Sequence, residues 1–139
     1  MAYDGSLESQ QALLNCKDFS QWEHAKVHLL SVVSYKTISI GHEASYYSEQ
    51  QNKIKKDRCL EVLHQGVEQL KKAGKEATGE LIQSDAVYEI VQYARNIDAD
   101  LIILGYNQDQ NLLERWWRGS IQKVLIDHSP CSVLFVITK

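Results

Sequence analysis

Several residue types and patterns are scarce in this sequence of 139 residues, and each shortage excludes a class of protein. Only three cysteines occur, they stand far apart, and none belongs to a Cys-x-x-Cys pair, so neither a disulfide framework nor a zinc site is predicted. No apolar run approaches the roughly 18 residues that cross a bilayer, and the first residues lack the basic and apolar regions of a signal peptide. We therefore expect reduced thiols, no membrane partner and a cytoplasmic location.

Positive charge and catalytic motifs are scarce as well. The formal net charge is -3, which gives no electrostatic reason to expect nucleic acid as a partner. The sequence contains no nucleophile elbow, HExxH motif or P-loop lysine. We therefore expect a binding or signalling protein rather than an enzyme, folded as one domain over residues 1–139.

What the sequence does contain is an alternation of strand and helix patterns. Short runs rich in branched apolar residues predict strands, and apolar residues at three- and four-residue steps predict the helices between them. The predicted strands are 25–34, 76–83, 101–104 and 133–137. The predicted helices begin at Ser6, at about Tyr46, at Ser84-Asp85 and at Gly119-Ser120. This order predicts an α/β fold with a parallel sheet, in which ligands bind at the carboxyl ends of the strands.

Five segments carry a combination of residues that is specific only when they are taken together. They are Asp4-Gly5-Ser6, LLSVVS at 29–34, DADLIILG at 98–105, Gly119 to His128, and VLFV at 133–136. In this combination the chain resembles the universal stress protein family over nearly all of its length. The resemblance implies one three-layer α/β/α domain with a mostly parallel five-stranded sheet, of the adenine nucleotide alpha hydrolase-like type, and a role in the response to stress.

The resemblance also implies a nucleotide site. In the family members that bind ATP, a loop reads Gly, two residues, Gly, nine residues, Gly, then Ser or Thr. Glycines let backbone N–H groups approach phosphate oxygens, and the following helix N-terminus favours negative charge. The residues that the resemblance places at this site are Asp4, Val32, Gly105, Gly119 and Ser120. The implied ligand is ATP or AMP, with Mg.

The middle of this loop departs from the family pattern. Gln108 stands where the second glycine is expected, and ten residues separate Gln108 from Gly119. Asp109 adds a carboxylate where phosphates would lie. Family members that lack the glycines are not thought to bind ATP, so nucleotide binding and a nucleotide-free role both stay open.

Each implied site residue also has a purely structural interpretation. Asp4 is then a turn residue beside a helix cap, and Val32 is part of the core. Gly105 then ends the apolar run 101–104, and Gly119-Ser120 opens a helix that needs a small residue and a cap. The residues alone do not choose between the two interpretations.

The first strand of the family is shortened in this chain. The family begins with an apolar central strand before Asp-Gly-Ser, whereas only Met1, Ala2 and Tyr3 precede Asp4 here. Without that strand the sheet has a gap of about 10 Å with unpaired backbone on both sides. We therefore expect the natural chain to begin upstream, with Met1 as an internal methionine.

The last predicted strand is an apolar edge strand, Ser132–Thr138. Such an edge promotes aggregation if it stays bare. Pairing it with the same strand of a second copy gives an isologous homodimer. The alternative function is therefore a nucleotide-free dimeric interaction protein of the same fold. A third, a weak nucleotide hydrolase, lacks a candidate base and metal ligands.

Overall fold

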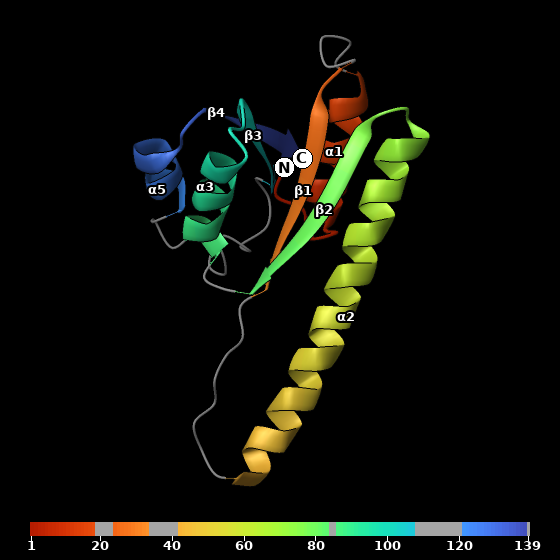
Figure 1. The fold of residues 1–139 in the computed structure, drawn as a ribbon, viewed down its shortest axis with the longest axis vertical. Helices are drawn as coiled ribbons and strands as arrows, with labels where there is room; N and C mark the ends of the chain where they lie inside the picture. The colour runs from red at the N-terminus through yellow and green to blue at the C-terminus, as the bar shows by residue number, and fades with distance from the viewer. Residues whose placement is uncertain (19–23, 34–41, 84–85, 108–120, 139) are drawn as a thin grey trace.

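The computed structural model describes residues 1–18, 24–33, 42–83, 86–107 and 121–138 (Figure 1). The helices are α1 (Leu7–Asp18), α2 (His42–Lys72), α3 (Ala86–Asn96) and α5 (Ile121–His128). The strands are β1 (Lys26–Val33), β2 (Glu76–Gln83), β3 (Leu101–Asn107) and β4 (Ser132–Thr138). Strands and helices alternate from β1 to β4, which confirms the predicted α/β fold.

The strands form two parallel pairs. β1 pairs with β2, and β3 pairs with β4, each over the full length of both strands. The predicted parallel direction is therefore confirmed for these pairs. The expected five-stranded sheet is not confirmed, because the described residues form four strands in two two-stranded sheets.

The first three residues lie between the two pairs. Ala2 forms a parallel bridge with Leu30 of β1. The Tyr3 amide donates to the Leu30 carbonyl at 2.8 Å, and the Leu30 amide donates to the Met1 carbonyl at 2.9 Å. On the other side, the Ala2 amide donates to the carbonyl of Ile103 in β3 at 3.0 Å. This segment thus takes the position expected for a central strand, but it makes too few ladder contacts to form one.

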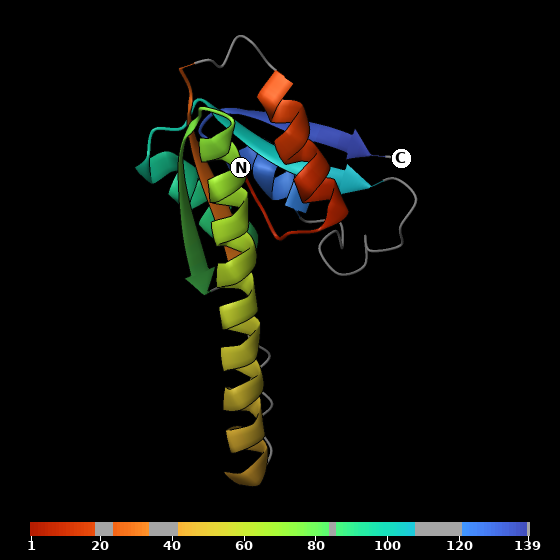
Figure 2. The same ribbon diagram turned by 90° about the vertical axis from the view of Figure 1, so that its right-hand side faces the viewer.

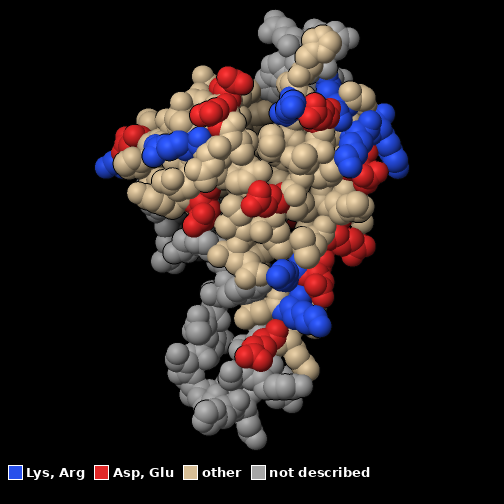
Figure 3. Space-filling view, viewed as in Figure 1, with Lys and Arg blue, Asp and Glu red and all other residues tan. Residues whose placement is uncertain are grey.

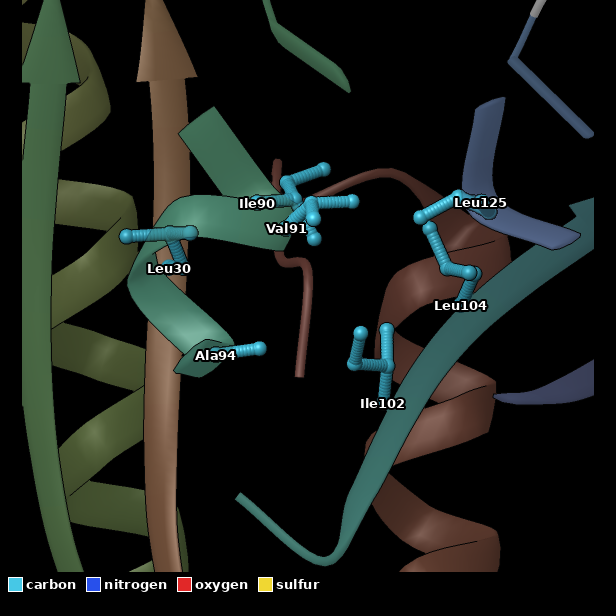
Figure 4. Packing of buried hydrophobic residues seen from close by; sticks show 7 residues of the cluster. All are labelled: Leu30, Ile90, Val91, Ala94, Ile102, Leu104 and Leu125. Atoms are coloured by element: carbon cyan, nitrogen blue, oxygen red, sulfur yellow. The ribbon is translucent and has the colours of Figure 1, made fainter. Parts of the chain in front are cut away.

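Helices cover both faces of the strands (Figures 1 and 2). α1 packs on β3 and β4, and α2 packs on β1 and β2. Their buried side chains form one core, here called the α1–α2 cluster, which consists of Tyr3, Leu13, Leu29, Leu63, Val67, Leu70 and Ala77. On the opposite face lies the α3–α5 cluster of Leu30, Ile90, Val91, Ala94, Ile102, Leu104 and Leu125 (Figure 4). The result is a helix–strand–helix layering.

α2 is much longer than the strands it covers. It begins at His42, four residues before the predicted start, and Figure 2 shows its first half extending beyond the strands and the other helices. Leu63 and Leu70 are buried in its second half, whereas Ile54 is 68% exposed in the first. The apolar residues that recur along this helix therefore pack against the core only toward its C-terminal end.

Charged side chains of both signs are interspersed on the face shown in Figure 3. Exposed ion pairs join Lys26 to Glu76 at 3.2 Å and Lys71 to Glu68 at 3.4 Å. Exposed pairs contribute about 0–1 kcal/mol each, whereas burying one large apolar side chain contributes about 1.5–3 kcal/mol. Burial in the two clusters therefore dominates the stability of the fold.

Candidate functional site

Three of the predicted site residues lie at one rim of the strands. The segment Met1–Tyr3 runs parallel to β1, and its amide contact with Ile103 sets it beside β3. Ala2 pairs with Leu30 in a parallel bridge, and Asp4 and Val32 each lie two residues further along the chain. Asp4 is therefore level with Val32. Gly105 lies at the same end of β3, since its backbone contacts the first turn of α1. The chain thus gathers Asp4, Val32 and Gly105 at the carboxyl ends of parallel segments, where ligands bind in such folds.

Asp4 organises the turn that leads into α1. Its Oδ1 accepts a hydrogen bond from the Ser6 amide at 2.9 Å. The Ser6 hydroxyl in turn accepts one from the Ser9 amide at 3.2 Å, which confirms Ser6 as the predicted cap. The Gln10 side-chain amide donates to the Gly5 carbonyl at 2.7 Å. These contacts fit the structural interpretation of Asp4, while its exposed carboxylate remains accessible from solvent.

Gly5 was not among the predicted site residues, yet it is tightly confined. Its φ is +76°, in the left-handed region that favours glycine. A Cβ on Gly5 would overlap Cγ1 of Val62 in α2. The Asp-Gly-Ser turn therefore rests directly against α2, and the Asp-Gly dipeptide was the only sequence signal for a turn here.

Val32 lies near the end of β1 and is half-buried. Its side chain packs against the α3–α5 cluster. This contact supports the interpretation of Val32 as a core residue. Its place at the rim beside Asp4 is where the resemblance puts an apolar contact for adenine.

Gly105 does not end its strand, which corrects the prediction from the sequence. β3 continues through Gly105 to Asn107. A Cβ on Gly105 would lie 2.6 Å from both the backbone carbon and the oxygen of Glu8, and 2.9 Å from the Ser9 nitrogen. The small residue is needed because a helix backbone crosses the strand here, a contact between segments far apart in sequence that no local pattern reveals.

Gly119 and Ser120 lie outside the described residues, as do Gln108 and Asp109. The phosphate-binding interpretation of this loop, and the effect of Gln108 and Asp109 on nucleotide binding, therefore stay predictions. The predicted helix after Gly119-Ser120 is present as α5.

Tyr3 and Ser31 form a buried polar contact that the sequence did not indicate. The Ser31 hydroxyl, itself buried, donates to the Tyr3 carbonyl. Burial raises the pKa of the Tyr3 phenol, and the negative charge of Asp4 raises that pKa further. Tyr3, the residue before Asp4, is therefore uncharged and buried, and its carbonyl is hydrogen-bonded to Ser31. The turn at Asp4 thus begins directly after a residue that is fixed in the core.

A metal centre has no candidate in the described part of the chain. No group of three or more His, Cys, Asp or Glu side chains there is arranged to hold an ion. In the same residues, no helix combines the length and the apolar character that a bilayer crossing requires.

Comparisons with known proteins agree on one family. The model of the universal stress protein family matches residues 1–136. A Staphylococcus saprophyticus protein named for this family is 29% identical over 141 residues, covering 100% of this chain and 82% of that protein.

Solved structures share the fold. Protein MJ0577 aligns with a TM-score of 0.79 at 21% identity, covering 99% of this chain and 93% of that one. A universal stress protein family member from Arabidopsis thaliana, solved with AMP bound, aligns with a TM-score of 0.65 at 19% identity, covering 96% of this chain and 80% of that one. At these identities the likeness concerns the fold alone.

Proposed function

The chain belongs to the universal stress protein family, and on that premise we propose that it is a cytoplasmic stress-response protein that binds ATP or AMP. We further propose that it acts as a single domain over residues 1–139 and by binding rather than by catalysis. The observation that carries the proposal is the gathering of Asp4, Val32 and Gly105 at one rim. The AMP-bound structural relative adds support.

The described residues suit the nucleoside part of such a ligand. The exposed Asp4 carboxylate is an acceptor for a ribose hydroxyl or the adenine amino group. The half-buried Val32 offers an apolar contact for the flat base. The phosphates, with Mg in the case of ATP, would extend toward residues 108–120, where Gly119 and Ser120 are the proposed donors.

The test is a titration of the chain with AMP and with Mg-ATP by calorimetry and thermal shift. We expect binding at or below millimolar nucleotide, and a rise in Tm that grows with ligand concentration. Asp4→Ala should weaken binding about tenfold or more, because a charged acceptor is lost. Asp98→Asn is a matched control that removes an exposed carboxylate outside the site. No thermal shift at millimolar nucleotide would contradict the proposal.

A nucleotide-free homodimer is the second candidate, and the edge position of β4 favours it. β4 pairs with β3 alone among the described strands. Its residues 133–136 are only half-buried, and Ile137 is 54% exposed. Bare apolar edges of this kind are normally paired or protected.

The dimer is tested by light scattering at micromolar concentration, with Ile137→Lys as the variant. We expect a dimer for the unaltered chain and a shift toward monomer for the variant, because a lysine on an edge strand opposes pairing. A monomeric unaltered chain would count against the dimer. It would leave the nucleotide proposal to be judged by the titration.

A further inference from the structure

The first turn of α1 is held from two sides by glycines that come close to other elements. Gly105 of β3 contacts the backbone of Glu8 and Ser9. Gly5, just before the helix, contacts Val62 of α2. Both contacts lie within a few residues of Asp4, the acidic residue of the proposed nucleotide site.

The Gly105 contact leaves no room for any side chain. Its nearest neighbours are main-chain atoms of a helix, so they cannot swing away as the end of a flexible side chain can. A Cβ at 2.6 Å from the Glu8 carbonyl would displace either α1 or the end of β3. Gly105 is not among the residues with positive φ, so the close approach, and not backbone conformation, requires glycine.

The Gly5 contact is different in kind. Here the neighbour is a side-chain methyl group of Val62, which would overlap a Cβ at this position. The positive φ of Gly5 adds a second requirement for glycine. Shortening Val62 would relieve the close contact but would leave the positive φ of Gly5. The two requirements for glycine can therefore be separated by mutation.

We propose that Gly105 and Gly5 are positioning residues, because their close contacts fix the position of the Asp4 turn and of the first turn of α1 at the rim. In this account Gly105 supports nucleotide binding through α1, and not through its own contact with phosphate. The role in nucleotide binding rests on the function proposed above. The position of α1 does not depend on that function, because it is a property of the chain without ligand.

The first experiment compares Gly105→Ala with Gly74→Ala in the absence of nucleotide. A Cβ on Gly74 meets no atom within 4 Å, but its φ is +78°, so this control reports backbone conformation alone. We expect Gly105→Ala to lower Tm by about 5 °C or more, and to change the amide chemical shifts and hydrogen exchange of Glu8 and Ser9. Gly74→Ala should leave those amides unchanged. Unchanged α1 amides in folded Gly105→Ala would overturn the proposal.

A second experiment covers the case in which Gly105→Ala does not fold. Val62→Ala gives space next to Gly5, so Gly5→Ala should lower Tm by several degrees less in the Val62→Ala background than in the unaltered chain. Additive losses would show that the Val62 contact does not confine the turn, and would overturn the role of Gly5.

The nucleotide titration then separates the two proposals. If the unaltered chain binds AMP, we expect Gly105→Ala to weaken binding about tenfold together with the change in α1. Weaker binding with unmoved α1 amides would instead indicate direct contact with the ligand and contradict the positioning role. If the unaltered chain binds no nucleotide, the proposed function fails. The amide chemical shifts of Gly105→Ala still test whether Gly105 fixes the position of α1.

Discussion

The two strand pairs of this protein are alike in direction and differ in how they connect to the rest. β1 and β2 are linked by a continuous parallel ladder, as are β3 and β4. Between the pairs, the backbone link within the described residues consists of a few hydrogen bonds made by Met1, Ala2 and Tyr3. Side chains from both pairs meet in the α3–α5 cluster, where Leu30 of β1 and Ile102 of β3 belong to one core. Backbone hydrogen bonds thus stabilise each pair, and side-chain packing holds the pairs together.

The turns that precede β2 and β3 show a second contrast between the two pairs. At the end of α2, the Lys75 amide donates to the Leu70 carbonyl at 3.0 Å, and Gly74 has positive φ. At the end of α3, the Ala99 amide donates to the Ala94 carbonyl at 2.9 Å, but the residue with positive φ is Asp98. The same helix ending is therefore made by glycine before β2 and by a strained residue before β3.

The largest expected effect tests whether packing joins the pairs. Leu30 is 4% exposed, and Leu30→Ala should lower the free energy of unfolding by about 2–5 kcal/mol, because it leaves a cavity between the pairs. Leu14→Ala is the matched control, since Leu14 is 49% exposed, and should change stability by less than about 0.5 kcal/mol. Urea denaturation measures both. Equal losses would show that the cluster does not join the pairs.

The backbone link between the pairs should contribute less. Ala2→Pro removes the amide that donates to the Ile103 carbonyl, and should cost about 1–3 kcal/mol of unfolding free energy. Ala2→Gly keeps this donor and should cost less than Ala2→Pro. If Ala2→Pro exceeds Leu30→Ala in the same urea experiment, the backbone and not the packing would be the main connection.

A smaller effect should sharpen the contrast between the two turns. Asp98→Gly relieves the positive φ of an exposed residue, and should raise the unfolding free energy by about 0.5–1 kcal/mol. Gly74→Ala introduces the same strain at the other turn and should lower it by about 1 kcal/mol. Thermal unfolding of the two variants measures both changes. A loss of stability in Asp98→Gly would mean that the aspartate side chain serves the fold.

The smallest expected effect concerns the contact of α3 with β1 and β2 at high pH. Burial raises the pKa of Tyr93 above its ordinary value of 10.0, and its hydrogen bond to Glu80 and the charge of Glu80 raise that pKa further. The folded chain therefore keeps this proton to higher pH than the unfolded chain. The associated stability is complete below about pH 10 and is lost as pH rises through the folded pKa.

Tyr93→Phe tests this pH dependence, because it removes the titrating phenol. Its unfolding free energy should fall less steeply above about pH 10 than that of the unaltered chain. Tyr88→Phe is the control, since Tyr88 is 62% exposed. Urea denaturation at several alkaline pH values provides the comparison. Identical slopes for Tyr93→Phe and the unaltered chain would contradict the prediction.

Much of the fold was predictable from local patterns. Apolar runs and helical periodicity located the strands and helices, because both depend on neighbours in the chain. The cap at Ser6 was predicted correctly for the same reason. The start of α2 and the end of β3 were misplaced, since element boundaries depend on tertiary contacts that local patterns do not contain.

By itself, the sequence determined the alternation of elements, the parallel direction and the family resemblance, since each follows from periodicity, chain order or motif. Only the tertiary structure decided that Met1–Tyr3 lie between β1 and β3, and that Gly105 contacts α1. It also decided that Val32 packs against the α3–α5 cluster. The physical reason is that these contacts join residues tens of positions apart. They depend on the packing of whole elements, which no short segment encodes.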